Sequence, residues 1–186
     1  MFLRDVLATD VEAYLRMRCD PVMMAELGGP LPATHVARQV RRDAQLAADG
    51  TALIKMIVVD DAVAGTVTLW RPAPDDGTAA EIGWMVLPEF QGRGLAKQGV
   101  RTLLDQARAE GRRDTVHAFP AVTNGPSNGI CRALGFTLRG EEDVEFNDQV
   151  IRTRHWTLDL TRHRPAGESR LRGHQYHSGD GAGRRR

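Results

Sequence analysis

The segment from residue 81 to residue 96 constrains the fold more strongly than any other part of the chain. It starts with an apolar run that ends at Val86-Leu87, and such a run is typical of a buried strand. Pro88 has no N–H group to donate to a sheet, so we expect the strand to end there. The glycines of the run Gln-Gly-Arg-Gly at 91–94 then permit a tight turn, because glycine has no Cβ.

From Leu95 to about Arg112, apolar residues recur at helical spacing. The segment therefore predicts a strand, a glycine turn and a helix, in that order. The first turn of such a helix carries unpaired N–H groups and the positive end of the helix dipole, which together bind a phosphate or diphosphate. No Gly-Lys-Ser/Thr follows, which excludes a P-loop, and a Rossmann fingerprint would need a glycine at Lys97. The alternative is a strand-turn-helix unit that only packs.

Composition places the chain among ordinary globular domains. Its 186 residues, 41% of them hydrophobic and 26% charged, suffice for one domain with a core. No apolar run approaches the ~20 residues of a membrane span, and charges interrupt the N-terminus, so we expect neither a span nor a signal peptide. Cys19 and Cys131 form no metal-ligand pattern, which predicts a cytoplasmic protein without a metal site.

Charge is unevenly distributed between the main body of the chain and its C-terminal tail. The total is +1, but residues 163–186 hold six arginines against two acidic residues, a charge of +4, so the rest carries −3. We expect a folded domain over 1–162 and a disordered tail, rich in Arg, Gly and His, over 163–186. A mildly acidic body does not suggest nucleic-acid binding and is compatible with a cationic amine substrate. Binding of RNA or the ribosome by the tail is an alternative.

Periodicity and turn residues predict the order β-αα-βββ-α-β-α-ββ. Hairpins mixed with helical crossovers indicate an α/β (α+β) domain with a mixed sheet. Helices are expected at 11–18, 34–49, 95–112 and 124–134. Strands are expected at 2–8, 52–59, 63–70, 81–87, 114–119, 136–139 with 144–146, and 150–158, and turns or loops at 72–78 and 147–148.

Two blocks resemble the GNAT acetyltransferases. The run from Gln91 to Ala96 resembles the family signature Gln/Arg-x-x-Gly-x-Gly/Ala, and the run from Asn124 to Phe136 resembles its Asn-x-x-Ala/Ser … Leu-Gly-Phe block. With the element order, the resemblance covers about residues 2–160. It implies the GNAT fold: a mostly antiparallel mixed sheet that splays between its fourth and fifth strands, with helices on both faces.

The resemblance also implies acetyl-CoA as co-substrate and direct attack of an amine on the thioester in a ternary complex. The pantetheine arm would pair with the fourth strand, the N–H groups of the turn would hold the diphosphate, and the Val86 N–H would polarise the thioester carbonyl. The residues implied in cofactor binding are Met85, Val86, Leu87, Gln91, Gly92, Arg93, Gly94, Leu95, Ala96 and Asn124.

The candidate catalytic residues are few. Glu81, at the start of the central strand, is the candidate general base, acting through a water, while Glu26 and Glu89 are weaker candidates. Ser127 is small enough to let a thioester pass. Cys131 stands where many relatives place a tyrosine that protonates the leaving thiolate; the alternative is a buried, inert cysteine.

Within the family, the sequence most resembles the branch that acetylates the N-terminal alanine or serine of ribosomal proteins. That resemblance implies a protein N-terminal amine as acceptor. Acetylation of a small amine such as an antibiotic or polyamine, and a non-catalytic acyl-CoA-binding module, remain as alternatives. The sequence also leaves room for a homodimer.

Overall fold

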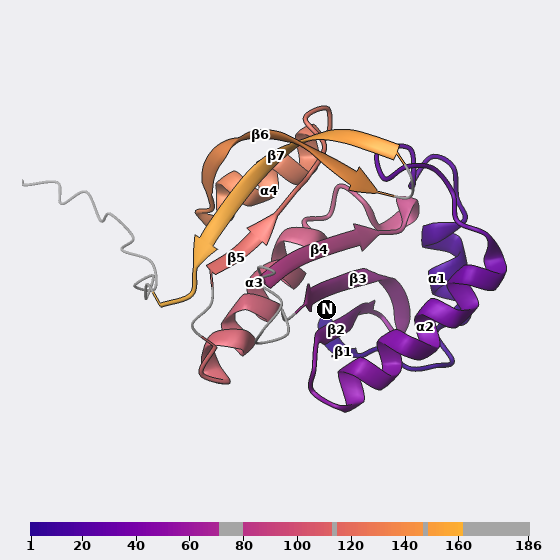
Figure 1. Ribbon diagram of the computed structural model, residues 1–186. Helices are drawn as coiled ribbons and strands as arrows, with labels where there is room; N and C mark the ends of the chain where they lie inside the picture. Colours follow the sequence, from indigo (N-terminus) through magenta and orange to yellow (C-terminus); the bar gives the residue numbers. More distant parts are fainter. Residues whose placement is uncertain (71–79, 113–114, 147–148, 162–186) are drawn as a thin grey trace, which may run out of the picture.

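The computed structural model describes residues 1–70, 80–112, 115–146 and 149–161. Figure 1 shows the elements in the predicted order. They are β1 (Phe2–Asp5), α1 (Val11–Arg18), α2 (Ala33–Ala48), β2 (Leu53–Val59), β3 (Ala62–Trp70), β4 (Ala80–Val86), the 3-10 turn η1 (Pro88–Phe90), α3 (Leu95–Ala109), β5 (Thr115–Ala118), α4 (Gly125–Leu134), β6 (Thr137–Phe146) and β7 (Gln149–Asp159).

One seven-stranded sheet, ordered β1-β2-β3-β4-β5-β7-β6, carries the fold. All neighbouring strands are antiparallel except β4 and β5. These two parallel strands pair at only two positions, Ala80 with Val116 and Glu81 with His117. Beyond that point they diverge, as Figure 1 shows. The predicted GNAT fold, with its splayed sheet, is confirmed.

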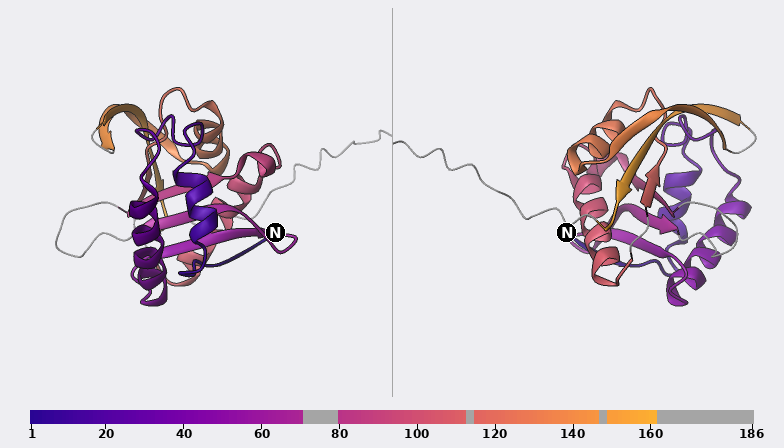
Figure 2. Two further views of the ribbon diagram at one scale, coloured as in Figure 1. Left: turned by 90° about the vertical axis from the view of Figure 1, so that its right-hand side faces the viewer. Right: turned by 60° about the vertical axis from the view of Figure 1, so that its left-hand side comes forward.

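Helices cover both faces of the sheet (Figure 2). Each pair of helices closes its own apolar core. The core under α3 and α4 includes Leu103, Leu104 and Leu134. The core under α1 and α2 includes Met17 and Val40. Side chains along β4 alternate between the two cores, as a strand buried on both faces requires. Ile82 and Val86 lie in the α3–α4 core, whereas Met85 and Leu87 lie in the α1–α2 core.

The sixth strand differs from its prediction. Two short pieces were expected because the run Gly-Glu-Glu-Asp at 140–143 looks unfavourable for a strand, but β6 is continuous and pairs with β7 along its length. It is the edge of the sheet and mostly exposed, so charged side chains cost little there. Cross-strand ion pairs join Glu141 to Arg154 and Asp143 to Arg152, each at 3.2 Å.

Asp10 lies at the start of α1. It is the N-cap residue, but its carboxylate makes no cap hydrogen bond. It accepts hydrogen bonds from the Arg4 guanidinium at 2.7 and 2.8 Å and from the Leu7 N–H at 2.8 Å. Burial opposes ionisation of Asp10, but these donors outweigh it and lower the pKa of the carboxyl. The residue thus ties β1 to α1.

The predicted loop at 72–78, the turn at 147–148 and the tail at 163–186 lie outside the described residues. Within the described ranges, no helix is both long and apolar enough to cross a membrane.

Candidate functional site

The free edge of β4 is the centre of the site. The Leu87 N–H donates to the Ala64 carbonyl on β3 at 2.9 Å. Because backbone groups alternate along a strand, those of Met85 face β3 as well, whereas those of Trp84 and Val86 face the opposite edge. On that edge β5 pairs only as far as Glu81. The Trp84 and Val86 groups therefore line the opening between the strands, where an extended chain can pair with them.

This corrects the sequence-based assignment of backbone contacts. Met85, Val86 and Leu87 were all expected to pair with an added chain. The Leu87 amide is already bonded to β3, and the Met85 and Leu87 side chains are buried in the α1–α2 core. Trp84, which the sequence analysis missed, shares the free edge with Val86. The register of β3 against β4 determines which backbone groups of β4 face the opening, and the sequence does not reveal that register.

Close contact with β3 fixes the position of β4. A Cβ added at Gly65 would overlap the Met85 carbonyl oxygen and lie 2.9 Å from the Val86 Cα. Real Cβ atoms do not approach backbone this closely, so only glycine allows β3 to sit here. The sequence gives no signal for this, because an isolated strand glycine has several explanations.

The turn after β4 exposes a row of main-chain amides. Gly92 and Gly94 have φ of +73° and +74°, a conformation that favours glycine, and α3 begins at Leu95 with no side-chain cap. Within the described residues, the structure records no acceptor for the amides from Gly92 to Ala96. A Cβ on either glycine would meet nothing within 4 Å. The space in front of these amides is open to an anion.

Two neighbouring side chains complete the turn. The Gln91 side-chain amide donates to the Val86 carbonyl at 2.9 Å, and its backbone N–H donates to the Pro88 carbonyl at 3.1 Å. Gln91 therefore holds the turn against the end of β4. Arg93 is exposed, with its guanidinium carbon 5.7 Å from the centroid of the Phe90 ring. That stacking keeps a positive charge beside the open amides.

The second family block caps the helix on the other side of the opening. The Asn124 Oδ1 accepts from the Ser127 N–H at 2.9 Å, so Asn124 is the N-cap of α4, as predicted. Asn128, which the sequence analysis did not single out, is buried and fully bonded. It donates to the carbonyls of Ala121 and Asn124 and accepts from the Trp156 indole at 2.9 Å. It fixes α4 to β7 and to the segment after β5.

The Cys131 thiol belongs to the α3–α4 core. The residue is fully buried, and desolvation raises the pKa of the thiol to about 12. A thiol with no access to solvent or substrate exchanges protons poorly, so we leave Cys131 out of the proposed chemistry. The alternative in the sequence analysis, a buried and inert cysteine, describes this environment.

Glu81 stands where β4 and β5 part. It shares the face of β4 that carries Met85 and Leu87, because residues two apart lie on one face. Desolvation by surrounding protein raises the pKa of its carboxyl, although the residue as a whole keeps access to solvent. The two weaker candidates are engaged elsewhere. Glu26 accepts from the Thr123 hydroxyl at 2.8 Å, and Glu89 pairs with Arg16 at 2.5 Å.

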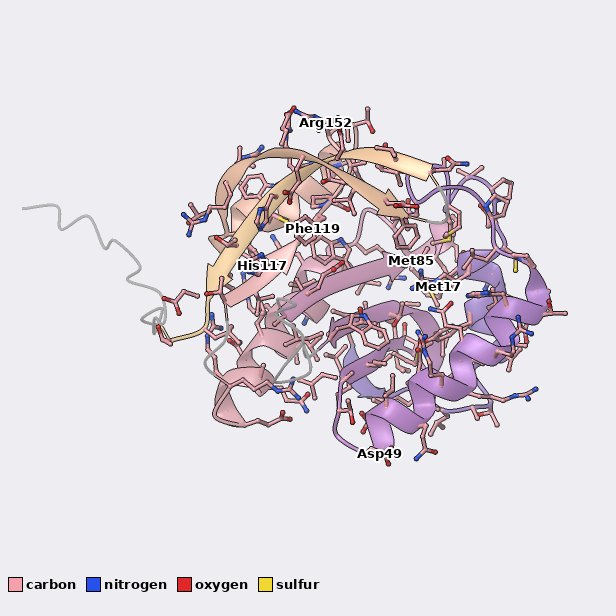
Figure 3. The ribbon with its side chains drawn as sticks, in the orientation of Figure 1. Met17, Asp49, Met85, His117, Phe119 and Arg152 are labelled. Carbon is pink, nitrogen blue, oxygen red and sulfur yellow. The ribbon has the colours of Figure 1, made fainter. Side chains whose placement is uncertain are left out.

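A histidine pair that sequence reasoning missed lies beside Glu81. His117 on β5 is the register partner of Glu81, and its Nδ1 is 2.7 Å from Nε2 of His155 on β7. Phe119 stacks on His155 with ring centroids 4.8 Å apart. Figure 3 labels His117 on β5, Phe119 directly after that strand and Met85 on β4. The alternation of His117 and Phe119 with buried residues was a weak signal, but nothing in the sequence joined His117 to His155.

Among the described residues, no group of three or more His, Cys, Asp or Glu side chains is arranged to hold a metal ion. The donors that face the opening are main-chain amides, a guanidinium, a carboxylate and imidazoles. This set suits an anionic, extended ligand on one side and proton transfer on the other.

Comparison with known proteins identifies the family. A family model described as an acetyltransferase (GNAT) domain matches residues 1–137. An acetyltransferase from Salmonella typhimurium that modifies the N-terminal serine of ribosomal protein L7/L12 has a similar structure, with a TM-score of 0.71 at 22% identity over 84% of this chain and 93% of that chain. The ribosomal-protein-S5-alanine acetyltransferase from Vibrio fischeri gives 0.70 at 18% over 88% and 94%.

A third similar structure is the microcin C7 self-immunity acetyltransferase MccE in complex with acetyl-CoA and AMP, with a TM-score of 0.71 at 20% identity over 84% of this chain and 91% of that chain. At such identities the three structures bear on the fold alone. The family match spans most of the chain and agrees with the splayed sheet and the glycine turn. The chain therefore belongs to the GNAT family and is an N-acetyltransferase.

Proposed function

We propose that this enzyme transfers the acetyl group of acetyl-CoA to the N-terminal amine of a protein by direct attack in a ternary complex. The observation that carries the proposal is the free edge of β4 at Trp84 and Val86, which runs directly into the exposed amides of residues 92–96. A pantetheine arm is an extended chain with amide groups, and a diphosphate follows it. The two features match these two parts in order.

On the donor side, the amides from Gly92 to Ala96 hold the diphosphate, and Arg93 adds a charge-assisted contact. Gln91 keeps the turn in shape through its bond to the Val86 carbonyl. The Val86 N–H is then left to polarise the thioester carbonyl as an oxyanion donor. The buried side chains of Met85, Leu87 and Leu95 hold this segment in place.

Across the opening, α4 offers two further groups. The Asn124 Oδ1 is used in its cap, so its amide N–H groups are the ones that reach a pantetheine carbonyl. Ser127 is half-buried at the same helix end, and its small side chain leaves room for the thioester.

On the acceptor side, Glu81 acts through a water to remove a proton from the incoming ammonium, which must be neutral to attack. Its position at the parting of β4 and β5, on the face covered by α1 and α2, supports this role. Glu26 bridges the segment between α1 and α2 to Thr123 and adds negative charge at the rim. Acidic groups on this side favour a cationic amine.

The choice of a protein N-terminus rests on the sequence resemblance to the ribosomal-protein branch, and two of the similar structures are named for ribosomal-protein acetylation. The test is a mass-spectrometric acetylation assay with peptides that begin with Ala or Ser, the same peptides with a blocked N-terminus, and a panel of polyamines and aminoglycosides. We expect acetylation of the free peptides alone. Transfer to free amines but not peptides would move the acceptor to a small molecule. Acetyl-CoA binding without turnover on any amine would indicate a binding module.

A further inference from the structure

The contacts of the histidine pair favour one placement of the ring protons. His155 Nδ1 lies 3.3 Å from the Glu142 carboxylate on β6, within ion-pair distance. The negative charge beside this nitrogen favours a proton there, and neutral His155 then presents a lone pair at Nε2. His117 Nδ1, 2.7 Å from that lone pair, must then be the donor. The lone pair of His117 is thereby left on its other nitrogen, Nε2.

His117 Nε2 is in a position to accept a proton. Within the described part of the chain, the bond through Nδ1 is the only hydrogen bond recorded for the ring, and the residue is half-buried. In register, His117 is the partner of Glu81, and neighbouring strands lie about 4.8 Å apart. Both side chains point to the face opposite the α3–α4 core, to which their neighbours Val116 and Ile82 belong. One water molecule can contact both.

The groups around His117 favour the neutral form of its imidazole. Burial lowers the pKa of His117, and the neighbouring His155 and Arg139 lower it further, while Glu142 acts in the opposite direction. Around it stand Glu81 from β4, His155 from β7, and Glu142 and Arg139 from β6, the last bonded through Nε to the Thr157 hydroxyl at 2.7 Å. Phe119 stacks against His155 and restrains its ring.

We propose that His117 Nε2 receives the proton that the acceptor amine loses, and that His155 and Glu142 are positioning residues that hold His117 in the required tautomer. This rests on the proposed function. The ammonium N–H bond breaks, the water held by Glu81 passes the proton on, and a bond to Nε2 forms. The freed amine pair attacks the thioester. The second amine proton goes to the departing thiolate, giving free CoA, and the imidazolium later returns its proton to solvent.

The arrangement follows the logic of a triad, with a second histidine inserted between base and carboxylate. The positive charge on His117 is stabilised through His155 by Glu142. Replacement of Glu142 by Gln removes the negative charge that favours Nδ1–H on His155, and an amide can either accept from or donate to that nitrogen, so both tautomers become accessible. In the second tautomer His155 donates from Nε2 to His117 Nδ1, and His117 carries its proton on Nε2, facing the water as a donor.

The first test reads the tautomers without any substrate. Nitrogen-15 NMR of the histidine-labelled enzyme should show Nδ1–H in both His117 and His155, and Glu142→Gln should add the Nε2–H form of both rings. The matched control is Glu145→Gln on the same strand, whose side chain faces the other way. If His117 of the wild type carries its proton on Nε2, the inference is overturned whatever the activity.

The second test measures kcat/KM against pH with the amine found in the acetylation assay. We expect His117→Gln to lower kcat/KM about a hundredfold and Glu142→Gln about tenfold, with unchanged acetyl-CoA affinity. The control His35→Gln, an exposed histidine on α2, should match the wild type. The acid limb of the wild type should lie below about pH 6.5, since the pKa of His117 is lowered, and should be absent in His117→Gln.

The outcomes separate this inference from the proposed function. A wild type that acetylates an amine while His117→Gln works equally well, or keeps the same acid limb, rejects the inference and leaves the function standing. A wild type that acetylates no amine rejects both. Thermal unfolding of each variant shows whether a loss of activity comes from a loss of structure. If added imidazole restores the activity of His117→Ala but not that of His155→Ala, proton transfer at His117 is supported.

Discussion

The two sides of the opening between β4 and β5 are built from different chemical groups. The donor side, β4 and the turn into α3, presents main-chain groups set by two left-handed glycines and a buried strand. The acceptor side presents side chains from β4, β5, β6 and β7: Glu81, His117, Glu142 and His155. A main-chain site needs a local conformation, whereas a side-chain site needs several strands in register.

The same contrast separates the strands. Every residue of β2 is buried, so its apolar run predicts a strand from the sequence alone. Nearly all of β6 is exposed and half of its residues are charged, and it is a strand only because β7 pairs with it. Figure 3 labels Arg152 of β7, which pairs with Asp143 of β6. Substitutions on the donor side should therefore act on folding and cofactor affinity, and those on the acceptor side on turnover and pH dependence.

The largest effect is expected at Gly65. Gly65→Ala places a methyl group against the Met85 carbonyl, so β3 and β4 must separate, and we expect a loss of about 3 kcal/mol in the free energy of unfolding. Urea denaturation measures it. The matched control is Gly83→Ala on β4, where the nearest atom is the Thr68 hydroxyl oxygen at 3.3 Å, which can rotate away. Equal losses for both variants would contradict the close strand contact.

On the acceptor side, Glu81→Gln should lower turnover about a hundredfold, because the carboxylate that holds the water and favours removal of the ammonium proton is lost. Acetyl-CoA affinity, measured by calorimetry, should stay near that of the wild type, since no donor-side group changes. Turnover equal to the wild type across about pH 6 to 9 would remove Glu81 from the mechanism.

On the donor side, Gly94→Val should weaken acetyl-CoA binding at least about tenfold, about 1.4 kcal/mol, without a direct effect on proton transfer. A β-branched residue is strained at φ +74°, and its side chain would fill the open space in front of the amides. Gly50→Val, at φ +69° after α2 and also with nothing within 4 Å, carries the same strain far from the turn. If both variants bind acetyl-CoA alike in calorimetry, the diphosphate does not sit at Gly94.

The smallest effect is expected at the exposed hairpin. Asp143→Asn removes an ion pair whose partners are both more than half exposed, so its loss should cost less than about 0.5 kcal/mol. Asp10→Asn, which breaks a buried carboxylate bonded to Arg4 and to the Leu7 amide, should cost several times more. Thermal unfolding compares the two, and a larger loss at Asp143 would mean that the ion pairs, not strand pairing, hold β6.

The sequence by itself determined the order of elements and the glycine turn, and its resemblance to the GNAT family implied the splayed sheet. The order and the turn depend on local signals: Pro88 ends a strand, Gly92 and Gly94 adopt left-handed φ, and apolar residues repeat with the period of each element. The N-cap at Asn124 also depends on a local signal, because its hydrogen bond to Ser127 spans only three residues.

Only the tertiary structure decided which edge of β4 is free and why Gly65 is required. It also brought His117 into a hydrogen bond with His155, whose other ring nitrogen lies 3.3 Å from Glu142. His117 and His155 are 38 residues apart in the chain and meet because β5 and β7 pair in one register. A shift of one residue would turn either ring to the opposite face. Register is fixed by the packing of the whole sheet, so no local pattern predicts that these side chains meet.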